Sequence, residues 1–388
     1  MTTLSSELAY ARGELLRSTA DDIAKLRAAW RIVARRHAQG TLYDFTGLVR
    51  SIPFAKGPLD DELAPALYGE RLTELGLEHL GGVPGRDDVF LANRTTAGIV
   101  AAMQVLVPAG GRVVGFSAGY SHPAVRRAVA LAGGELEDVR ALDGPIDADL
   151  LVLTRLAVTY EALSAQQIER AVELAGDVPV FVDDAGGARV GPAVLGQPRM
   201  LELGAVAGVT GLDKYGTAGP RLGLVGGRAE IVARIRARAI ELGLEARPML
   251  YPAVVASLEQ YRPERVRELV ATTAELADRL PDWAVRTPVA VKLEGEDILA
   301  AIGARGGALV PIEATAGLAM ILLRDHGILT VHFAALPPGT SALLLKFVPP
   351  ETLERFGGAH AFGAAVDTSL QELARVVAGG ELRALLGL

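Results

Sequence analysis

The sequence has no cysteine. This absence excludes disulfides, thiolate metal ligands and thiol nucleophiles, and with them any chemistry that passes sulfur through an enzyme persulfide. Long apolar runs are also missing. A membrane span needs about 18 apolar residues, and the one uncharged run of that length, Gly327 to Leu345, is broken by His332 and Pro337-Pro338. Because Glu7 and Arg12 also interrupt any apolar stretch at the start, we expect neither a targeting segment nor a membrane span, and predict a soluble, cytoplasmic protein.

Aromatic residues are scarce, at 5%, whereas 50% of the residues are hydrophobic, so the core is mainly aliphatic. A chain of 388 residues exceeds one average domain, and two unequal domains are expected. The net charge of -7 argues against a large nucleic-acid surface. The six histidines show no paired ligand spacing, and without cysteines to join them they predict no metal site.

Residues 1 to about 40 have a helical pattern, with apolar residues such as Leu26 and Trp30 at helix-like intervals and arginines between them. We interpret this segment as a surface helix that packs on a partner subunit. A basic arm for RNA is the alternative, which Asp21, Asp22 and the acidic total weaken.

From about residue 85 the chain alternates between strand and helix, the pattern of a mostly parallel sheet covered on both faces. The first strand, residues 88–92, runs into Asn93-Arg94-Thr95-Thr96-Ala97-Gly98, which begins a helix. Unpaired N–H groups at a helix start, with threonine hydroxyls beside them, form an anion site. The same residues also suit a simple helix cap. No GxGxxG follows this strand, so the pattern does not support a doubly wound dehydrogenase.

Other side chains follow the later strands of this region. Tyr120 and His122 come after the strand at residues 112–116, and His122 precedes a proline that fits a first helical turn. Arg155 follows the strand at residues 150–154. Since the carboxyl ends of parallel strands meet at one edge, these side chains should border a common crevice.

The most informative stretch runs from Pro179 to Arg221. An apolar strand, residues 179–182, leads directly into Asp183 and Asp184, and a second apolar run leads into Gly211-Leu212-Asp213-Lys214. Carboxylates at the end of a buried strand are costly unless they are used. A lysine amid small residues can hold a carbonyl cofactor as a Schiff base, and a strand-end aspartate can keep a pyridine nitrogen protonated. The pair suits pyridoxal phosphate.

These residues resemble those of fold-type I pyridoxal phosphate-dependent enzymes. The stretch Gly211-Leu212-Asp213-Lys214, followed by Gly219-Pro220, is similar to the SGDK…GP stretch of the selenocysteine synthases (L-seryl-tRNA(Sec) selenium transferases) and their archaeal relatives of unknown activity, with Leu212 inserted. The resemblance implies a large domain with a mixed, mainly parallel seven-stranded sheet and a smaller α+β domain made from the C-terminal part with help from the N-terminus. It also implies a homodimer or higher homo-oligomer.

The resemblance further implies site roles. Lys214 would carry the cofactor and Asp183, the first acid of the pair, would contact its pyridine nitrogen. The other implied cofactor contacts are Thr95, Thr96, Ala97, His122 and Thr210. Arg50 and Arg155 would contact the substrate. Whether His122 or Tyr120 stacks on the cofactor stays open.

We predict an N-terminal arm with a substrate-mouth segment at residues 1–60, a large cofactor domain at 61–255 and a small domain at 256–388. Residues 252–280 have the pattern of a long helix interrupted near Pro263, and residues 289–293, 327–333 and 341–347 have that of strands. A helix from about residue 367 to 377 should close the domain. The last strand carries Lys346 where many aminotransferases have an arginine for the substrate carboxylate.

The resemblance favours a lyase or transferase that acts by beta-elimination or replacement on a serine-like amino acid or an amino-sugar phosphate. An aminotransferase and a non-catalytic pyridoxal phosphate-binding protein are the alternatives. A tRNA-dependent enzyme would need a basic docking region that this acidic chain does not show.

Overall fold

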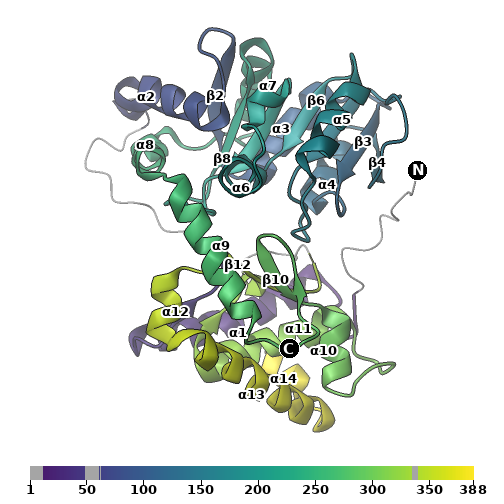
Figure 1. Ribbon diagram of the computed structural model, residues 1–388, viewed down its shortest axis with the longest axis vertical. Helices are drawn as coiled ribbons and strands as arrows, with labels where there is room; N and C mark the ends of the chain where they lie inside the picture. Colours follow the sequence, from purple (N-terminus) through teal and green to yellow (C-terminus); the bar gives the residue numbers. More distant parts are fainter. Residues whose placement is uncertain (1–11, 49–60, 62, 334–339) are drawn as a thin grey trace. The chain divides into compact units, whose positions relative to one another are not determined.

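The computed structural model describes residues 12–48, 61, 63–333 and 340–388, which form two compact units. The first unit consists of residues 48–267. The second combines the described residues 12–47 with residues 268–388, and Figure 1 shows the purple helix α1 among the green and yellow elements of the C-terminal part. The domain limits at residues 60 and 255 stay a prediction.

The first unit is built on a sheet of seven strands in its described part. The strands are β2 (Asp87–Ala92), β3 (Arg112–Ser117), β4 (Glu135–Val139), β5 (Leu150–Thr154), β6 (Val180–Asp183), β7 (Ala207–Gly211) and β8 (Gly223–Arg228). Their order is β2-β8-β7-β6-β5-β3-β4, and β8 alone runs antiparallel to its neighbours β2 and β7. The predicted mixed, mainly parallel seven-stranded sheet is confirmed.

Helices cover both faces of this sheet (Figure 1). The helices of the unit are α2 (Leu63–Leu80), α3 (Thr95–Leu106), α4 (Pro123–Leu131), α5 (Ala165–Ala175), α6 (Gly187–Val194), α7 (Ala229–Glu241) and α8 (Tyr251–Gln260), with short 3-10 turns η1 (Met200–Leu203) and η2 (Pro248–Leu250). Strand residues alternate between the two faces, so that Leu150 and Val152 pack with α3, α4 and α7, whereas Leu151 and Leu153 pack with α2, α5 and α8. This double coverage explains why β5 is apolar at every position but its last.

Local signals set several helix starts. Ser164 caps α5 with a capping box, in which its hydroxyl accepts from Gln167 N–H and the Gln167 side chain accepts from Ser164 N–H. His122 caps α4, with Pro123 in the first turn. Helix α9 (Pro263–Ala277) begins at the predicted interruption and continues the chain from the first unit into the second.

The second unit packs around a single apolar core. Its elements are α1 (Thr19–Ala38), β1 (Tyr43–Asp44), β9 (Val285–Arg286), β10 (Ala290–Leu293), α10 (Gly295–Ala301), α11 (Pro311–His326), β11 (Ile328–Leu329), η3 (Val331–Phe333), β12 (Leu343–Lys346), α12 (Pro350–Phe356), α13 (Gly358–Ala378) and α14 (Leu382–Leu386). Strands β12, β10 and β9 form an antiparallel sheet, and β1 pairs with β11 in parallel. Helix α11 lies at the centre, with every residue from Ile312 to Leu323 buried.

Two sequence expectations for this unit are corrected. The strand predicted at residues 327–333 is limited to the two residues of β11, after which η3 turns the chain and buries His332. The polar residues Thr330 and His332 are buried there, whereas Val331 is half-buried, so the alternation of apolar residues does not mark a strand with one buried face. The closing helix is longer than predicted, since α13 runs from Gly358 to Ala378.

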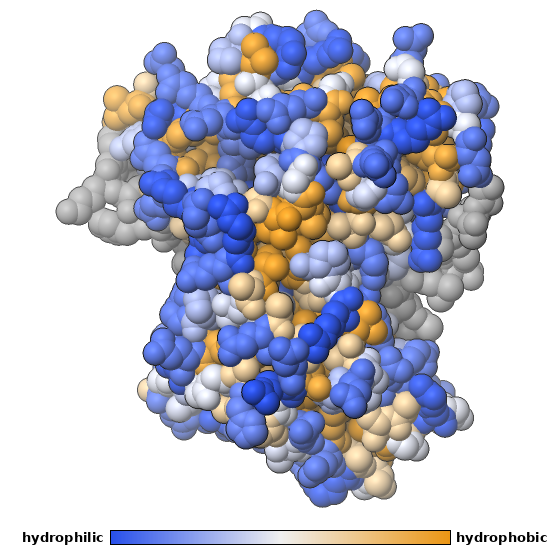
Figure 2. Space-filling view, in the orientation of Figure 1, coloured by the Kyte–Doolittle hydropathy of each residue, from blue (hydrophilic) through white to orange (hydrophobic). Residues whose placement is uncertain are grey.

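The surface view shows mainly hydrophilic residues on the face drawn, with apolar residues gathered in a few patches (Figure 2). No helix in the described part of the chain is long and apolar enough to cross a membrane.

Candidate active site

The carboxyl ends of β6 and β7 bring the two central predicted residues into one region. The strands are parallel neighbours, with Asp183 opposite Val209, and Lys214 follows the end of β7 by three residues. Asp183 is buried, whereas Lys214 is partly exposed. The positive charge of Lys214 acts on Asp183, which places the two groups within electrostatic reach of each other.

Asp183 has an unusual environment for a carboxylate. It is 2% exposed, and its Oδ1 atom has no hydrogen-bond partner among the described residues. Burial raises the pKa of Asp183 to about 6, although the charge of Lys214 lowers it; the nearby Asp184 adds a further increase. A buried carboxylate oxygen without a donor is costly, so the site favours a ligand that brings a proton to Asp183.

The neighbouring Asp184 points to the other side, where Arg155 occupies it. The Arg155 Nε and Nη2 atoms donate to the two Asp184 carboxylate oxygens, and Nη1 donates to the Pro198 carbonyl. Both side chains are fully buried. This ion pair corrects the predicted role of Arg155: its guanidinium is engaged within the protein, and we no longer propose it as a substrate contact.

The start of helix α3 lies directly beside the Lys214 strand. A Cβ atom on Gly211 would lie 2.9 Å from Thr95 Oγ1 and 3.4 Å from Lys214 Cε, so glycine is needed for this close approach. Thr95 is the first residue of α3, and no side chain caps the helix there. Thr96 is exposed and Ala97 half-buried. The first N–H groups of α3 therefore face an open region next to Lys214, as an anion site requires.

His122 lies at the carboxyl end of β3, next to the same region. Its Nδ1 accepts a hydrogen bond from Ala124 N–H at 3.1 Å, which leaves the ring proton on Nε2. The residue is exposed. Even so, the protein packed around the ring, followed by the charges of Lys214, Arg127 and Arg94, lowers the pKa of His122 to about 4. A neutral, partly exposed ring at this place can stack on a flat cofactor.

The two remaining predicted site residues are Thr210 and Arg50. Thr210 is fully buried on β7, and its Oγ1 has no hydrogen-bond partner in the described part of the chain. Arg50 lies outside the described residues. Just before it, Leu48 forms an antiparallel bridge with Lys214, so the segment that leads to Arg50 passes beside the lysine.

The structure adds two tyrosines to this region: Tyr160, which the sequence already offered as a possible contact in the loop after residue 154, and Tyr215, which the sequence did not single out. Tyr215 follows Lys214 directly, and its hydroxyl lies 2.7 Å from that of Tyr160 in the loop after β5. Lys214 Nζ lies 5.4 Å from the centroid of the Tyr215 ring. Both tyrosines have a positive φ, 67° for Tyr160 and 58° for Tyr215, a conformation that side chains other than glycine rarely adopt and that clusters at functional sites.

Arg189 of α6 is the third addition. It is fully buried, it donates to the Gly211 carbonyl, and its guanidinium carbon lies 5.8 Å from the Tyr215 ring centroid. A single arginine within the small, apolar stretch from residue 185 to 194 was the signal in the sequence. The tyrosines gave a weaker signal, since nothing in the sequence shows that Tyr160 meets Tyr215.

The strand order, with one antiparallel strand among parallel ones and an aspartate and a lysine at adjacent strand ends, defines a fold-type I architecture. No family model matches the chain. It is 33% identical over 344 residues to a UPF0425 pyridoxal phosphate-dependent protein of Methanothermobacter thermautotrophicus, with 85% of this chain and 88% of that protein covered. It is 34% identical over 312 residues to the protein of the same name from Methanosphaera stadtmanae, with 76% of this chain and 80% of that protein covered. The chain belongs to the UPF0425 pyridoxal phosphate-dependent proteins.

Solved structures confirm the fold. A Thermus thermophilus aspartate aminotransferase double mutant superimposes with a TM-score of 0.55 and 16% identity, covering 97% of this chain and all of that one. The family name contains the cofactor that the sequence predicted, and that prediction is confirmed.

The residues present fit pyridoxal phosphate. Its pyridinium N–H would satisfy the Asp183 Oδ1 atom, its phosphate suits the start of α3, and its ring suits the open side of His122. Among the described residues, no group of three or more His, Asp and Glu side chains is arranged to hold a metal ion.

Proposed function

We propose that this protein is an enzyme that binds pyridoxal phosphate covalently through Lys214 and holds its pyridine nitrogen with Asp183. The observation that carries the proposal is the buried Asp183 Oδ1 atom without a hydrogen-bond partner among the described residues, one strand away from Lys214. The raised pKa of Asp183, about 6, supports it, because burial leaves this carboxylate poorly stabilised by the protein and so favours a ligand that donates an N–H to it.

The bound cofactor supplies an electron sink for a carbanion at the substrate's alpha carbon. The protein's own residues supply the rest. Lys214, once a substrate amine has taken its place, has a free amine that can remove the alpha proton. The N–H groups at Thr95 and Thr96 and the Thr95 hydroxyl would hold the phosphate, and His122 would lie beside the ring.

For the reaction we propose beta-elimination or replacement on a serine-like amino acid or an amino-sugar phosphate. The lysine stretch is similar to that of the selenocysteine synthases, and the absence of cysteine removes persulfide chemistry. Lys346, in the last strand of the second unit, is a point charge without the bidentate fork of an arginine. This departure from the arginine of many aminotransferases weakens the aminotransferase alternative.

Transamination is the second candidate, because the fold is that of aminotransferases such as the Thermus protein. Incubation with phosphoserine, serine and amino-sugar phosphates separates the two. Release of a keto product without a keto-acid acceptor supports elimination. Steady conversion of the cofactor to its amine form, with turnover only when a keto-acid acceptor is present, would replace it with transamination.

A pyridoxal phosphate-binding protein without turnover is distinguished by the same panel, since no amino compound would then change the cofactor's absorbance. Assembly as a homodimer or higher homo-oligomer, a cytoplasmic location and the absence of a tRNA partner also stay predictions.

A further inference from the structure

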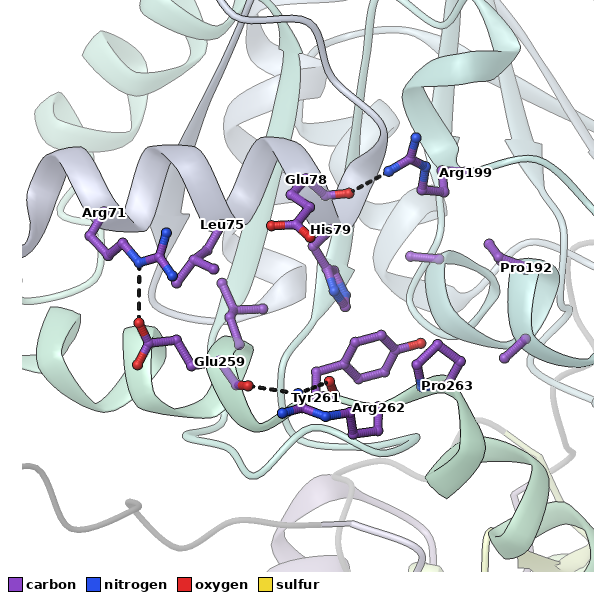
Figure 3. A pocket seen from close by; sticks show the side chains of 13 residues that line it. Arg71, Leu75, Glu78, His79, Pro192, Arg199, Glu259, Tyr261, Arg262 and Pro263 are labelled. Atoms are coloured by element: carbon purple, nitrogen blue, oxygen red, sulfur yellow. Dashed lines mark hydrogen bonds and ion pairs between the residues drawn. The ribbon is translucent and has the colours of Figure 1, made fainter.

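A second cavity lies in the first unit, apart from the Lys214 site. It is a cleft of about 640 Å³ lined by residues of α2, α6, α8 and the turn into α9. Figure 3 shows these side chains converging on one space from three helices. Its volume is within the range of about 300–1,000 Å³ that small-molecule sites have. None of the cofactor residues proposed above lines it.

The lining combines apolar and aromatic side chains with charged side chains of both signs. Apolar side chains come from all three helices, namely Leu75, Ala188, Pro192 and Leu258. Tyr261 and His79 lie edge to face beside them, with ring centroids 4.8 Å apart. Such a lining favours a ligand with an apolar body rather than a bare phosphate.

The charged side chains of the lining are Arg71, Arg199 and Arg262 together with Glu78 and Glu259. Arg71 is paired with Glu74 and Glu259, and Arg199 is paired with Glu202. Arg262 differs: its Nη1 donates to the carbonyls of Glu259, at 2.8 Å, and Tyr261, at 2.7 Å, and it makes no ion pair within the described part of the chain. Two carbonyls hold this guanidinium in place, which reduces the entropy lost when it binds an anion.

One hydrogen-bonded path joins the cleft to the Lys214 strand. The Nη1 atom of Arg189 lies 3.1 Å from His79 Nε2, and since arginine only donates, Nε2 accepts and the His79 proton is on Nδ1. The protein packed around His79 and the charge of Arg189 lower the pKa of His79 to about 3, so the ring is neutral at ordinary pH. Arg189 also donates to the Gly211 carbonyl, three residues before Lys214.

We propose that this cleft is a second binding site, for a small organic monoanion with an aromatic or branched aliphatic body, and that its occupant acts on the Lys214 site through His79 and Arg189. The apolar side chains bury the body and Arg262 binds the acid group. A ligand that displaces the His79 ring removes a hydrogen-bond acceptor from Arg189, which must then shift against Gly211 and Tyr215. The cleft is therefore a regulatory site in addition to the proposed function.

The binding test is a fluorescence titration of the cofactor-loaded full chain with 8-anilinonaphthalene-1-sulfonate, an aromatic monoanion. Excess pyridoxal phosphate keeps the probe out of the Lys214 site. Wild type should bind one probe saturably; Arg262→Gln should weaken binding about tenfold, and Arg262→Lys about threefold or less. The matched control is Arg238→Gln, an exposed arginine of α7 paired with Glu241, which should bind as wild type does. Non-saturable binding, or equal losses in the Arg262→Gln and Arg238→Gln variants, overturns the site.

The coupling test measures the rate of cofactor release from the same protein on dilution, with and without the probe. In wild type the probe should change this rate at least threefold. In His79→Leu, which cannot accept from Arg189, the probe should still bind but leave the rate unchanged. An unchanged rate in wild type overturns the coupling. If no cofactor is retained at all, the proposed function and the coupling both fail, whereas the titration on that protein still decides whether the cleft binds.

Discussion

Asp183 and Asp184 are adjacent in sequence at the carboxyl end of β6, but their side chains have opposite environments. On one side, Asp184 is fully buried and both of its oxygens accept from Arg155. On the other, Asp183 is equally buried, but its Oδ1 has no hydrogen-bond partner among the described residues. Alternation along the strand separates the two side chains. The Asp184 carboxylate therefore has a structural partner within the protein, whereas the Asp183 carboxylate is available to a ligand.

The two carboxylates also differ in how they affect the free energy of unfolding. A buried ion pair stabilises little in net terms, but removing one partner costs about 3–5 kcal/mol because the other charge stays buried and unpaired. An unpaired carboxylate instead costs stability as long as it is ionised, and the cost ends when a partner arrives. The Asp184 side should therefore respond to mutation in stability, and the Asp183 side in cofactor chemistry.

The largest expected effect is on covalent attachment. Lys214→Ala should abolish the cofactor fixed to the protein by borohydride reduction, because Lys214 is the lysine that follows the end of β7. The sequence has five lysines, Lys25, Lys56, Lys214, Lys292 and Lys346, so peptide mapping can assign the label without ambiguity. Lys292→Ala, which removes a buried lysine paired with Glu294, is the control and should label fully. A label that persists in Lys214→Ala, or that maps to another lysine, removes the centre of the proposal.

Asp183→Asn should retain the cofactor but lose turnover by about 100- to 1,000-fold, the usual cost of removing one electrostatic contact to a developing charge. An amide cannot hold the pyridine nitrogen protonated. Turnover per folded molecule should change much less in Asp184→Asn. The measurement is kcat on whichever substrate the panel identifies, and equal losses or the reverse order would show that the carboxylates are assigned to the wrong sides.

Asp184→Asn should instead lower the free energy of unfolding by about 3–5 kcal/mol, because Arg155 would keep its charge in a buried site without a carboxylate. Urea unfolding of the cofactor-free protein measures this. Asp183→Asn, measured alongside, should be stable or slightly stabilised. A destabilised Asp183→Asn together with an unaffected Asp184→Asn would reverse the comparison.

The sequence predicts some of this arrangement and misses the rest for a physical reason. Local patterns were enough for the alternating strands and helices, and for placing Asp183 and Lys214 at neighbouring strand ends, because strand ends bring their own residues to one edge of the sheet. They were not enough for Arg155, whose role depends on Asp184 being 29 residues away in sequence and adjacent in space. The meeting of Tyr160 with Tyr215 and of Arg189 with Gly211 also depends on tertiary packing that no local pattern contains.

A smaller effect concerns pH. The pKa of Asp183 is raised from 3.8 to about 6 in the folded chain, so the folded state holds a proton that the unfolded state has lost. This group therefore contributes stability that is full below pH 4 and is lost as pH rises through 6, a change of about 3 kcal/mol for a shift of about two units. In urea unfolding of cofactor-free protein, Asp183→Asn should lack this loss. Asp147→Asn, which alters a fully exposed carboxylate, should keep it, and a wild-type profile in Asp183→Asn would contradict the raised pKa.

The smallest effect tests which ring lies against the cofactor. His122 is neutral, since its pKa is lowered to about 4, and it can contribute only stacking and the Ala124 cap. His122→Ala should weaken cofactor affinity by about tenfold or less, because aromatic pairs contribute about 0.5–1.5 kcal/mol, whereas His122→Phe should retain most of it. Both variants lose the cap, so both should lose about 1 kcal/mol of stability, which separates the two roles of the side chain. Affinity is measured from cofactor release and stability from urea unfolding. If the alanine and phenylalanine variants bind the cofactor equally well, His122 acts only as a helix cap. Tyr120→Ala should then show the loss of cofactor affinity, since Tyr120 is the other planar side chain at the end of β3.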